Sequence, residues 1–465
     1  MLKQIKVLLI LLAACLPCQT FSQEKVWYFG NEAGIDFNGT SAVAITDGSM
    51  NVIDNAAAIS DFTGNLLFYT DGMNVWDRNH SLMPNGTGLM GESSNGQGSL
   101  IVQRPGTDLF YIFTVGQYNS TNGFRYHIVE LSQNGGFGDV ISKNILLLSP
   151  STERLDAVYN ELTNSYWIIT HGWNSNDFYS YELTQFGFNP VPVISPVGTV
   201  HTGGMLGHYN TMGQLCISPT KTKLVCGIYS DGVFELFDFD LNTGVISNPV
   251  PLGGFNNAWG AAFSPDGTKL YVSEWMNTEI TQLDISSGIA SVILNTATVV
   301  GHGTGPGGSY QAGYLQLAPD DKIYGAVFDD DYLLVINSPN QSGLACNLVD
   351  NGFFLNGKKS QAGLCRAVSS RSSFNSINET AVEKYYSVFP NPFVDEFNLT
   401  SHTNRFDGFN YSIFNSVGAE ILNGKLSETQ KEIINISGMP AGIYHLKISG
   451  TDIIGSKFER LIKLK

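Results

Sequence analysis

The chain has 465 residues, of which 43% are hydrophobic, 12% are aromatic and only 14% are charged, and 50 are glycines. This composition is typical of strands joined by tight turns, and the length fits about two to four domains, or one large all-β unit with a tail. The net charge is −16, which argues against nucleic acid or an anionic membrane as a partner, because phosphate binding relies on clustered Lys and Arg.

Residues 1–22 have the regions of a secretory signal peptide. Lys3 and Lys6 precede an apolar run at 7–14, and small residues lead to Ser22. We expect cleavage after Ser22 and Sec-dependent export to the periplasm. The run is too short for a permanent membrane helix, so the mature chain has no predicted transmembrane segment. An alternative stays open, because residues 12–15 resemble a lipoprotein cleavage box that would make Cys15 a lipid anchor.

A hairpin pattern recurs from residue 23 to residue 370. Its clearest copy is 262–272, Ala-Phe-Ser-Pro-Asp-Gly-Thr-Lys-Leu-Tyr-Val. Pro265 presets φ for a turn, Asp266 can bond its own backbone, and Gly267 can take the left-handed conformation. Five related copies occupy residues 58–69, 101–112, 157–168, 215–225 and 315–324.

A second strand-rich segment follows each hairpin, for example 233–238 after 215–225. Four strands per repeat of about 45 to 60 residues predict a β-propeller over 23–370. The segments 26–37 and 363–368 lack a full repeat and together could complete a mixed blade. We therefore favour seven blades, with six as the alternative.

Four cysteines remain after the expected cleavage, and export makes them candidates for disulfides. Cys216 and Cys226 flank a probable hairpin turn, and Cys346 and Cys365 would close a longer loop. Buried thiols are the competing interpretation for both pairs.

Aromatic residues recur near the same phase of the repeats. A ring of such residues at one propeller mouth could stack on a sugar or hold a peptide, whereas the competing interpretation is packing between blades. The candidate ligand-binding residues are Trp76, His171, Trp173, Trp259 and Trp275.

No motif predicts a catalytic residue, a cofactor or a metal site. The Gly-rich segment 301–308 contains a formal G-x-G-x-x-G, but no helix pattern follows it and Pro306 removes a backbone donor. His201 and His208 lie in another Gly-rich stretch, where a surface loop is the simpler interpretation.

The segments 27–37, 64–72, 76–80 and 83–86 resemble secreted WD-type or Tol B-type propeller proteins of Bacteroidetes. This resemblance implies the propeller fold for most of 26–370. It transfers no catalytic residue.

Residues 371–384 form a polar linker, and 385–465 a second domain. Two prolines after Phe389 indicate an edge strand, and about six or seven short strands predict a small β-sandwich. Pro390-Asn-Pro392, Asn415-x-x-Gly418 and Gly442-x-Tyr444 resemble the C-terminal sorting domain of the type IX secretion system. That resemblance implies docking on the export machinery and a location outside the cell or on the outer-membrane surface.

These observations lead to a secreted or surface-attached propeller that binds a glycan, peptide or protein at its channel mouth. A propeller hydrolase or lyase acting on glycans is the alternative, because fold alone does not decide function. A structural part of a surface or gliding apparatus is the third possibility. The sequence leaves the oligomeric state open.

Overall fold

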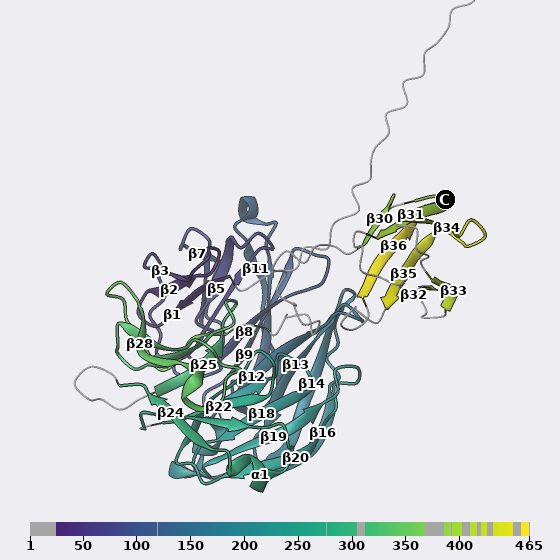
Figure 1. The fold of residues 1–465 in the computed structure, drawn as a ribbon. Coiled ribbons are helices and arrows are strands. Elements are labelled where there is room, and N and C mark those ends of the chain that lie inside the picture. The colour runs from purple at the N-terminus through teal and green to yellow at the C-terminus, as the bar shows by residue number, and fades with distance from the viewer. Residues whose placement is uncertain are drawn as a thin grey trace, which may run out of the picture. The chain divides into compact units, whose positions relative to one another are not determined.

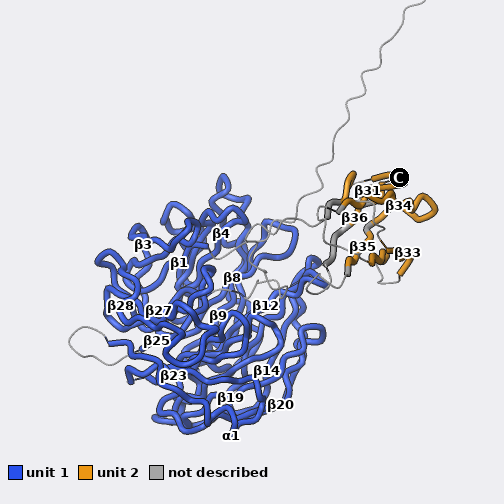
Figure 2. Tube along the Cα trace, in the orientation of Figure 1, with its two compact units in different colours: residues 1–373 blue, residues 374–465 orange. Residues whose placement is uncertain are grey.

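The computed structural model describes residues 25–118, 120–275, 277–304, 312–366, 368, 386–391, 393–401, 410–415, 420–425, 431–449 and 457–464. The chain divides into two compact units, residues 1–373 and 374–465 (Figure 2). The expected signal segment 1–22 and linker 371–384 lie outside the described residues. Within those described ranges, no helix has the length and apolar character needed to cross a membrane.

Seven sheets among the described residues of the first unit confirm the predicted propeller (Figure 1). The first four are β1–β3 (Val26–Phe29, Ala33–Asp36, Val43–Ile45), β4–β7 (Ala56–Ser60, Leu66–Thr70, Asn74–Asp77, Leu82–Thr87), β8–β11 (Ser99–Gln103, Leu109–Val115, Phe124–Glu130, Asp139–Leu148) and β12–β16 (Ser151–Asn160, Ser165–Gly172, Ser175–Thr184, Gly187–Phe188, Val193–His201). The other three are β17–β20 (Leu215–Ile217, Lys223–Ile228, Val233–Phe239, Ile246–Gly253), β21–β24 (Ala258–Phe263, Lys269–Glu274, Glu279–Asp284, Thr298–His302) and β25–β28 (Ala312–Leu317, Ile323–Val327, Tyr332–Ile336, Leu348–Phe354). A short helix, α1 (Ala290–Leu294), joins β23 to β24.

Alternating side chains of each strand pack against the two neighbouring sheets. In β8, for example, Leu100 joins the core shared with β12–β16, whereas Ile101 joins the core shared with β4–β7. This follows from the two-residue period of a strand, whose successive side chains point to opposite faces. The apolar core is therefore distributed between the blades around the whole ring.

The ring closes differently from the expected mixed blade. The N-terminal strands form their own three-stranded sheet, β1–β3. The closing strand β29 (Cys365–Arg366) instead pairs in parallel with Ala56 and Ala57 of β4, in the next sheet. Cys365 still packs in the same core cluster as Trp27 of β1, so the segment returns to the predicted place but joins the neighbouring ladder.

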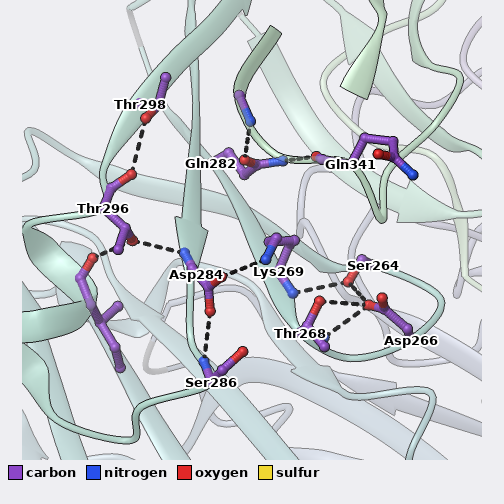
Figure 3. A network of polar contacts seen from close by, with 12 residues as sticks. Ser264, Asp266, Thr268, Lys269, Gln282, Asp284, Ser286, Thr296, Thr298 and Gln341 are labelled. Carbon is purple, nitrogen blue, oxygen red and sulfur yellow. Dashed lines mark hydrogen bonds and ion pairs between the residues drawn. The ribbon is translucent and has the colours of Figure 1, made fainter. Parts of the chain in front are cut away.

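The Pro-Asp-Gly turn has the predicted mechanism. One carboxylate oxygen of Asp266 accepts bonds from the Ser264 hydroxyl at 2.6 Å and from the Thr268 amide at 3.0 Å, and Gly267 has φ of 72° (Figure 3). Gln282, in β23 of the same sheet, donates to the carbonyl of Gln341 at 2.7 Å. Gln341 belongs to the β27–β28 connection, so polar side chains also join adjacent blades.

Hydrogen bonds cross the axis of the ring between blades that are not neighbours. Gln97, before β8, exchanges two bonds of 2.7 Å with the backbone of Leu215 in β17. Gln214, before β17, donates to the carbonyl of Leu315 in β25 at 2.9 Å. Gly96 also lies close to Tyr314 of β25. A Cβ added at Gly96 would lie only 1.9 Å from the Tyr314 hydroxyl, so only glycine fits there. These contacts bring the inner strands of non-neighbouring blades within reach of one another's side chains across the axis.

The second unit is the predicted sandwich. One sheet has the order β30-β31-β34 and the other β33-β32-β35-β36. The bounds are β30 Tyr386–Phe389, β31 Glu396–Ser401, β32 Asn410–Asn415, β33 Glu420–Lys425, β34 Lys431–Asn435, β35 Gly442–Ser449 and β36 Lys457–Lys463. The strand before the two prolines, β30, lies at a sheet edge as expected. Phe397, Ile413 and Leu446 pack between the two sheets.

Candidate functional site

Aromatic side chains gather at one end of the ring, where the inner strands β4, β8, β12, β17, β21 and β25 begin. We call this end the mouth. Trp259 opens β21 and contacts Tyr314 of β25 at a ring-centroid distance of 4.8 Å. Trp275, which follows β22, lies 4.7 Å from Trp259, and Tyr229, which follows β18, lies 5.7 Å from it. Three blades thus contribute to one aromatic cluster.

The ring contacts continue toward two further blades. Tyr209 contacts Tyr229 at 5.8 Å and stacks at 5.9 Å with Tyr118, which follows β9. His208 lies 4.3 Å from Tyr118. We call the complete set the mouth cluster: Tyr118, His208, Tyr209, Tyr229, Trp259, Trp275 and Tyr314. Its floor, Tyr229, Trp259 and Tyr314, is buried, whereas the other four side chains are half-buried and reach solvent.

Two carboxyl groups lie beneath this cluster. Glu153 of β12 accepts the backbone N–H of Tyr118 at 2.7 Å and the hydroxyl of Thr211 at 3.4 Å. Burial raises the pKa of Glu153 to about 7. Burial also raises the pKa of Asp54, just before β4, well above its usual range, and the charge of Glu153 adds to this effect. One oxygen of Asp54, Oδ1, is buried without a hydrogen-bond partner among the described residues.

The neighbouring Arg154 positions backbone instead of meeting a ligand. Its side chain is fully buried, and its guanidinium donates to the carbonyl of Thr211 at 2.8 Å and to that of Met212 at 2.6 Å. It also donates to the carbonyls of Asn210 and Gly227. The arginine thereby holds the segment that carries His208 and Tyr209 against the inner strands.

That segment also exposes apolar side chains. Met205 is 55% exposed and Leu206 is 73% exposed. Leu206 has φ of 56°, a left-handed conformation that is unfavourable for a residue with a branched side chain. A strained and exposed leucine beside the half-buried rings gives the mouth an apolar rim.

Of the five predicted candidates, the structure brings two together, Trp259 and Trp275. Trp173 follows β13 but does not belong to the mouth cluster, and it is buried. Trp76 lies on β6, where it stacks on Tyr69 at 5.4 Å. His171 is fully buried in β13. Trp76 packs against the core cluster that includes Trp27 of β1, whereas the ring contacts of His171, with Phe178 and His201, lie within its own sheet.

His171 has an unexpected partner. Its ring stacks on that of His201 from β16 at a centroid distance of 3.7 Å. Burial lowers the pKa of His171 to about 3 and that of His201 well below its usual range, so both imidazoles are neutral. His208 lies in the mouth cluster and stacks on Tyr118 instead. Among the described residues, no group of three or more His, Cys, Asp or Glu is arranged to hold a metal ion.

The expected disulfides are wrong. No disulfide joins two cysteines in the described ranges. Cys216 pairs across the hairpin with Val225, so Cys216 and Cys226 are one residue out of register and point to opposite faces of the sheet. They belong to different core clusters, as do Cys346 and Cys365.

Several residues that the sequence did not single out share a positional signal with Trp275, which it did. Tyr229, Trp275 and Phe328 each directly follow the second strand of a repeat, and Tyr118 lies three residues beyond one. Aligning the six hairpin copies by that strand would have placed Tyr229 beside Trp275. The signal for Tyr209, Glu153 and Asp54 is absent, because their proximity depends on closure of the ring.

Comparison with known proteins identifies the tail. Residues 387–463 match the family model of the secretion system C-terminal sorting domain. This confirms the predicted type IX sorting domain and implies an interaction with that secretion machinery. It also implies a secreted protein or one on the outer-membrane surface. No curated protein matches the sequence.

Solved structures resemble the chain only distantly. A Bacteroides uniformis protein proposed to be a 6-phosphogluconolactonase is 13% identical, with a TM-score of 0.45, and the match covers 75% of this chain and 99% of that one. The periplasmic gluconolactonase of Pseudomonas aeruginosa is 11% identical, with a TM-score of 0.37 and coverages of 89% and 99%. The propeller domain of Myceliophteria thermophila Swd1 is 11% identical, with a TM-score of 0.38 and coverages of 66% and 96%. At these scores the likeness carries no argument about activity.

Proposed function

We propose that this chain, whose C-terminal domain is a type IX sorting domain, is an exported binding module that holds its ligand on the mouth cluster. The observation that carries the proposal is the unbroken run of ring contacts from Tyr118 to Trp275 across the mouth. Aromatic rings supply large apolar contact area with little loss of side-chain entropy on binding. We further propose that the chain reaches the periplasm by the Sec route before the sorting domain acts.

The half-buried members of the cluster are the ligand-facing residues of this proposal. Tyr118, His208, Tyr209 and Trp275 keep part of their surface in water, above the buried floor. Met205 and Leu206 extend the same apolar surface outward. Because side-chain hydrogen bonds cross the axis between β8 and β17 and between β17 and β25, the proposed ligand contacts this end of the ring.

A second candidate function rests on a separate observation, the two buried carboxyl groups. A carboxyl with a pKa of about 7, such as that of Glu153, can donate and accept protons near neutral pH. Glycosidases commonly use a pair of carboxyl groups, one of them with a raised pKa. This favours a hydrolase or lyase acting on glycans as the alternative to simple binding.

The test uses the purified full chain on a glycan array and a peptide array, with release of reducing ends followed in parallel. Trp275→Ala and Tyr209→Ala should abolish binding to any ligand held at the mouth. Phe354→Ala is the matched control, because it removes an aromatic side chain that is 44% exposed on the outer strand β28. Binding that persists in both mouth variants would refute the proposal, and release of reducing ends that is lost in Glu153→Gln would favour the enzyme.

A further inference from the structure

The charge around the mouth cluster is negative. Glu92, in the connection from β7 to β8, lies near enough to Glu153 to raise its pKa. Asp231, directly after Tyr229 and Ser230, is exposed and accepts the side-chain amide of Asn210 at 2.8 Å. Glu274 directly precedes Trp275 and is half-buried. These three carboxyl groups come from different connections or strand ends around the rings. Asp54 and Glu153 lie beneath, but burial raises their pKa values and so favours their uncharged forms.

The described basic residues near these carboxyl groups are already engaged. The guanidinium of Arg154 donates to backbone carbonyls, and its positive charge acts on the buried Glu153, whose pKa it lowers against the larger effect of burial. Arg366 forms a buried ion pair of 3.0 Å with Asp156, which accepts no other positive charge. No cation among these residues therefore neutralises Glu92 or Asp231.

A second observation is independent of the exposed acids. The Oδ1 atom of Asp54 is buried beside Tyr314 and receives no hydrogen bond from the described residues. Burial raises the pKa of the Tyr314 hydroxyl, and Asp54 and Glu153 add to that rise whereas Arg154 and Arg366 oppose it, so all four groups lie close enough to act on the floor of the cluster. An uncompensated acceptor in a desolvated site is costly unless a ligand or another group compensates it.

From this juxtaposition we propose that the mouth ligand is a cationic peptide whose lysine or arginine side chain lies on the rings of Tyr118, Tyr209 and Trp275. The inference rests on the proposed binding function and specifies the chemistry of its ligand. Aromatic faces attract ammonium and guanidinium groups, and the attraction strengthens in a partly desolvated site. The surrounding carboxylates add Coulomb attraction and steer a cation toward the mouth.

Other ligand chemistries fit less well. A carboxylate, sulfate or phosphate would be repelled by Glu92, Asp231 and Glu274 around the rings. A neutral glycan could stack on the rings, but it would leave that field uncompensated. The negative charge therefore selects for positive charge on the ligand.

The experiment titrates the full chain with pentalysine, cellohexaose and pentaglutamate and follows tryptophan fluorescence. Glu92→Gln combined with Asp231→Asn removes two charges at the rim without changing the aromatic residues. The matched control is Asp108→Asn combined with Asp240→Asn, which removes the same charge from turns at the opposite end of the ring, between β8 and β9 and between β19 and β20.

We expect pentalysine alone to bind, with affinity that falls at least about tenfold between low and physiological salt because of screening. The rim double variant should weaken binding about tenfold, whereas the control pair should change it less than about twofold. Trp275→Ala should abolish it. Equal weakening by the two charge pairs would show a diffuse field and overturn the proposal.

The outcomes separate the two proposals. Cellohexaose binding that needs Trp275, without pentalysine binding, leaves the binding function standing and overturns the cationic ligand. Pentalysine binding that tolerates Trp275→Ala and Tyr209→Ala overturns both. Absence of pentalysine binding up to about 1 mM, a free energy weaker than about 4 kcal/mol, also overturns the cationic ligand.

Discussion

Replacing Glu153 by Gln should stabilise the propeller at alkaline pH and leave its stability nearly unchanged at acidic pH. The pKa of this buried carboxyl rises from 4.5 to about 7 in the folded chain. Between these two values the unfolded chain has lost the proton and the folded chain keeps it, so stability falls as the pH rises through this range. The shift corresponds to about 3 kcal/mol, present below pH 4.5 and lost above pH 7.

Glutamine mimics the protonated acid and keeps an oxygen that can accept the N–H of Tyr118. The difference in unfolding free energy, variant minus wild type, should therefore be near zero at about pH 4 and approach about 3 kcal/mol at about pH 8. Titrating groups that do not interact with Glu153 cancel in this difference. Urea unfolding followed by tryptophan fluorescence is the assay, because all six tryptophans lie between residues 27 and 275 and none lies in the sorting domain.

Two results would refute this reasoning. A difference that does not depend on pH would show that Glu153 titrates normally, with its carboxylate better solvated than its burial indicates. A variant that loses stability as the pH rises would show that the charged form is the stabilised one, held by Tyr118 and Thr211. Thr211→Val is the companion variant. It removes a hydrogen bond that the Glu153 carboxylate accepts from the Thr211 hydroxyl, so the pKa of Glu153 should rise further.

Three further predictions follow from the packing. Arg366→Gln should lower the free energy of unfolding in urea by about 3 to 5 kcal/mol, because it leaves the buried carboxylate of Asp156 without its ion-pair partner. Adding Asp156→Asn should restore part of that loss. An equal loss in the double variant would contradict the ion pair. Trp259→Ala should lower the free energy of unfolding by about 3 to 5 kcal/mol and Phe354→Ala by less than about 1 kcal/mol, because only the first leaves a cavity at a buried position. A larger loss in Phe354→Ala, measured in the same assay, would contradict this prediction. Reduction with a thiol should leave the unfolding midpoint unchanged, whereas a clear decrease would reveal a disulfide.

Local rules predicted most of the propeller from sequence. The turn at 264–268 forms as expected because each residue supplies its own conformational preference there. The strands after each hairpin also follow from alternation, and β6 spans the predicted residues 74–77. In the sandwich, the expectation of about six or seven short strands agrees with the seven strands β30–β36 among the described residues.

Properties that depend on register or closure could not be predicted. The hairpin disulfide failed through one residue of register, which reverses the face on which a side chain lies. The stacked pair His171 and His201 joins strands separated by about thirty residues, and no spacing rule indicates it. The mouth cluster was half predicted, because tryptophans stood out in the sequence whereas tyrosines were too common to notice.

The parallel pairing of β29 with β4 restricts where the chain can be cut. The ring is joined through Cys365 and Arg366, only about twenty residues before the sandwich begins. A protease that separates the sorting domain from its cargo must act beyond Val368, because cleavage before Cys365 would detach the closing strand and expose an edge of β4. Cleavage can therefore release the propeller from the sorting domain and leave the propeller intact only if it occurs between residues 368 and 386.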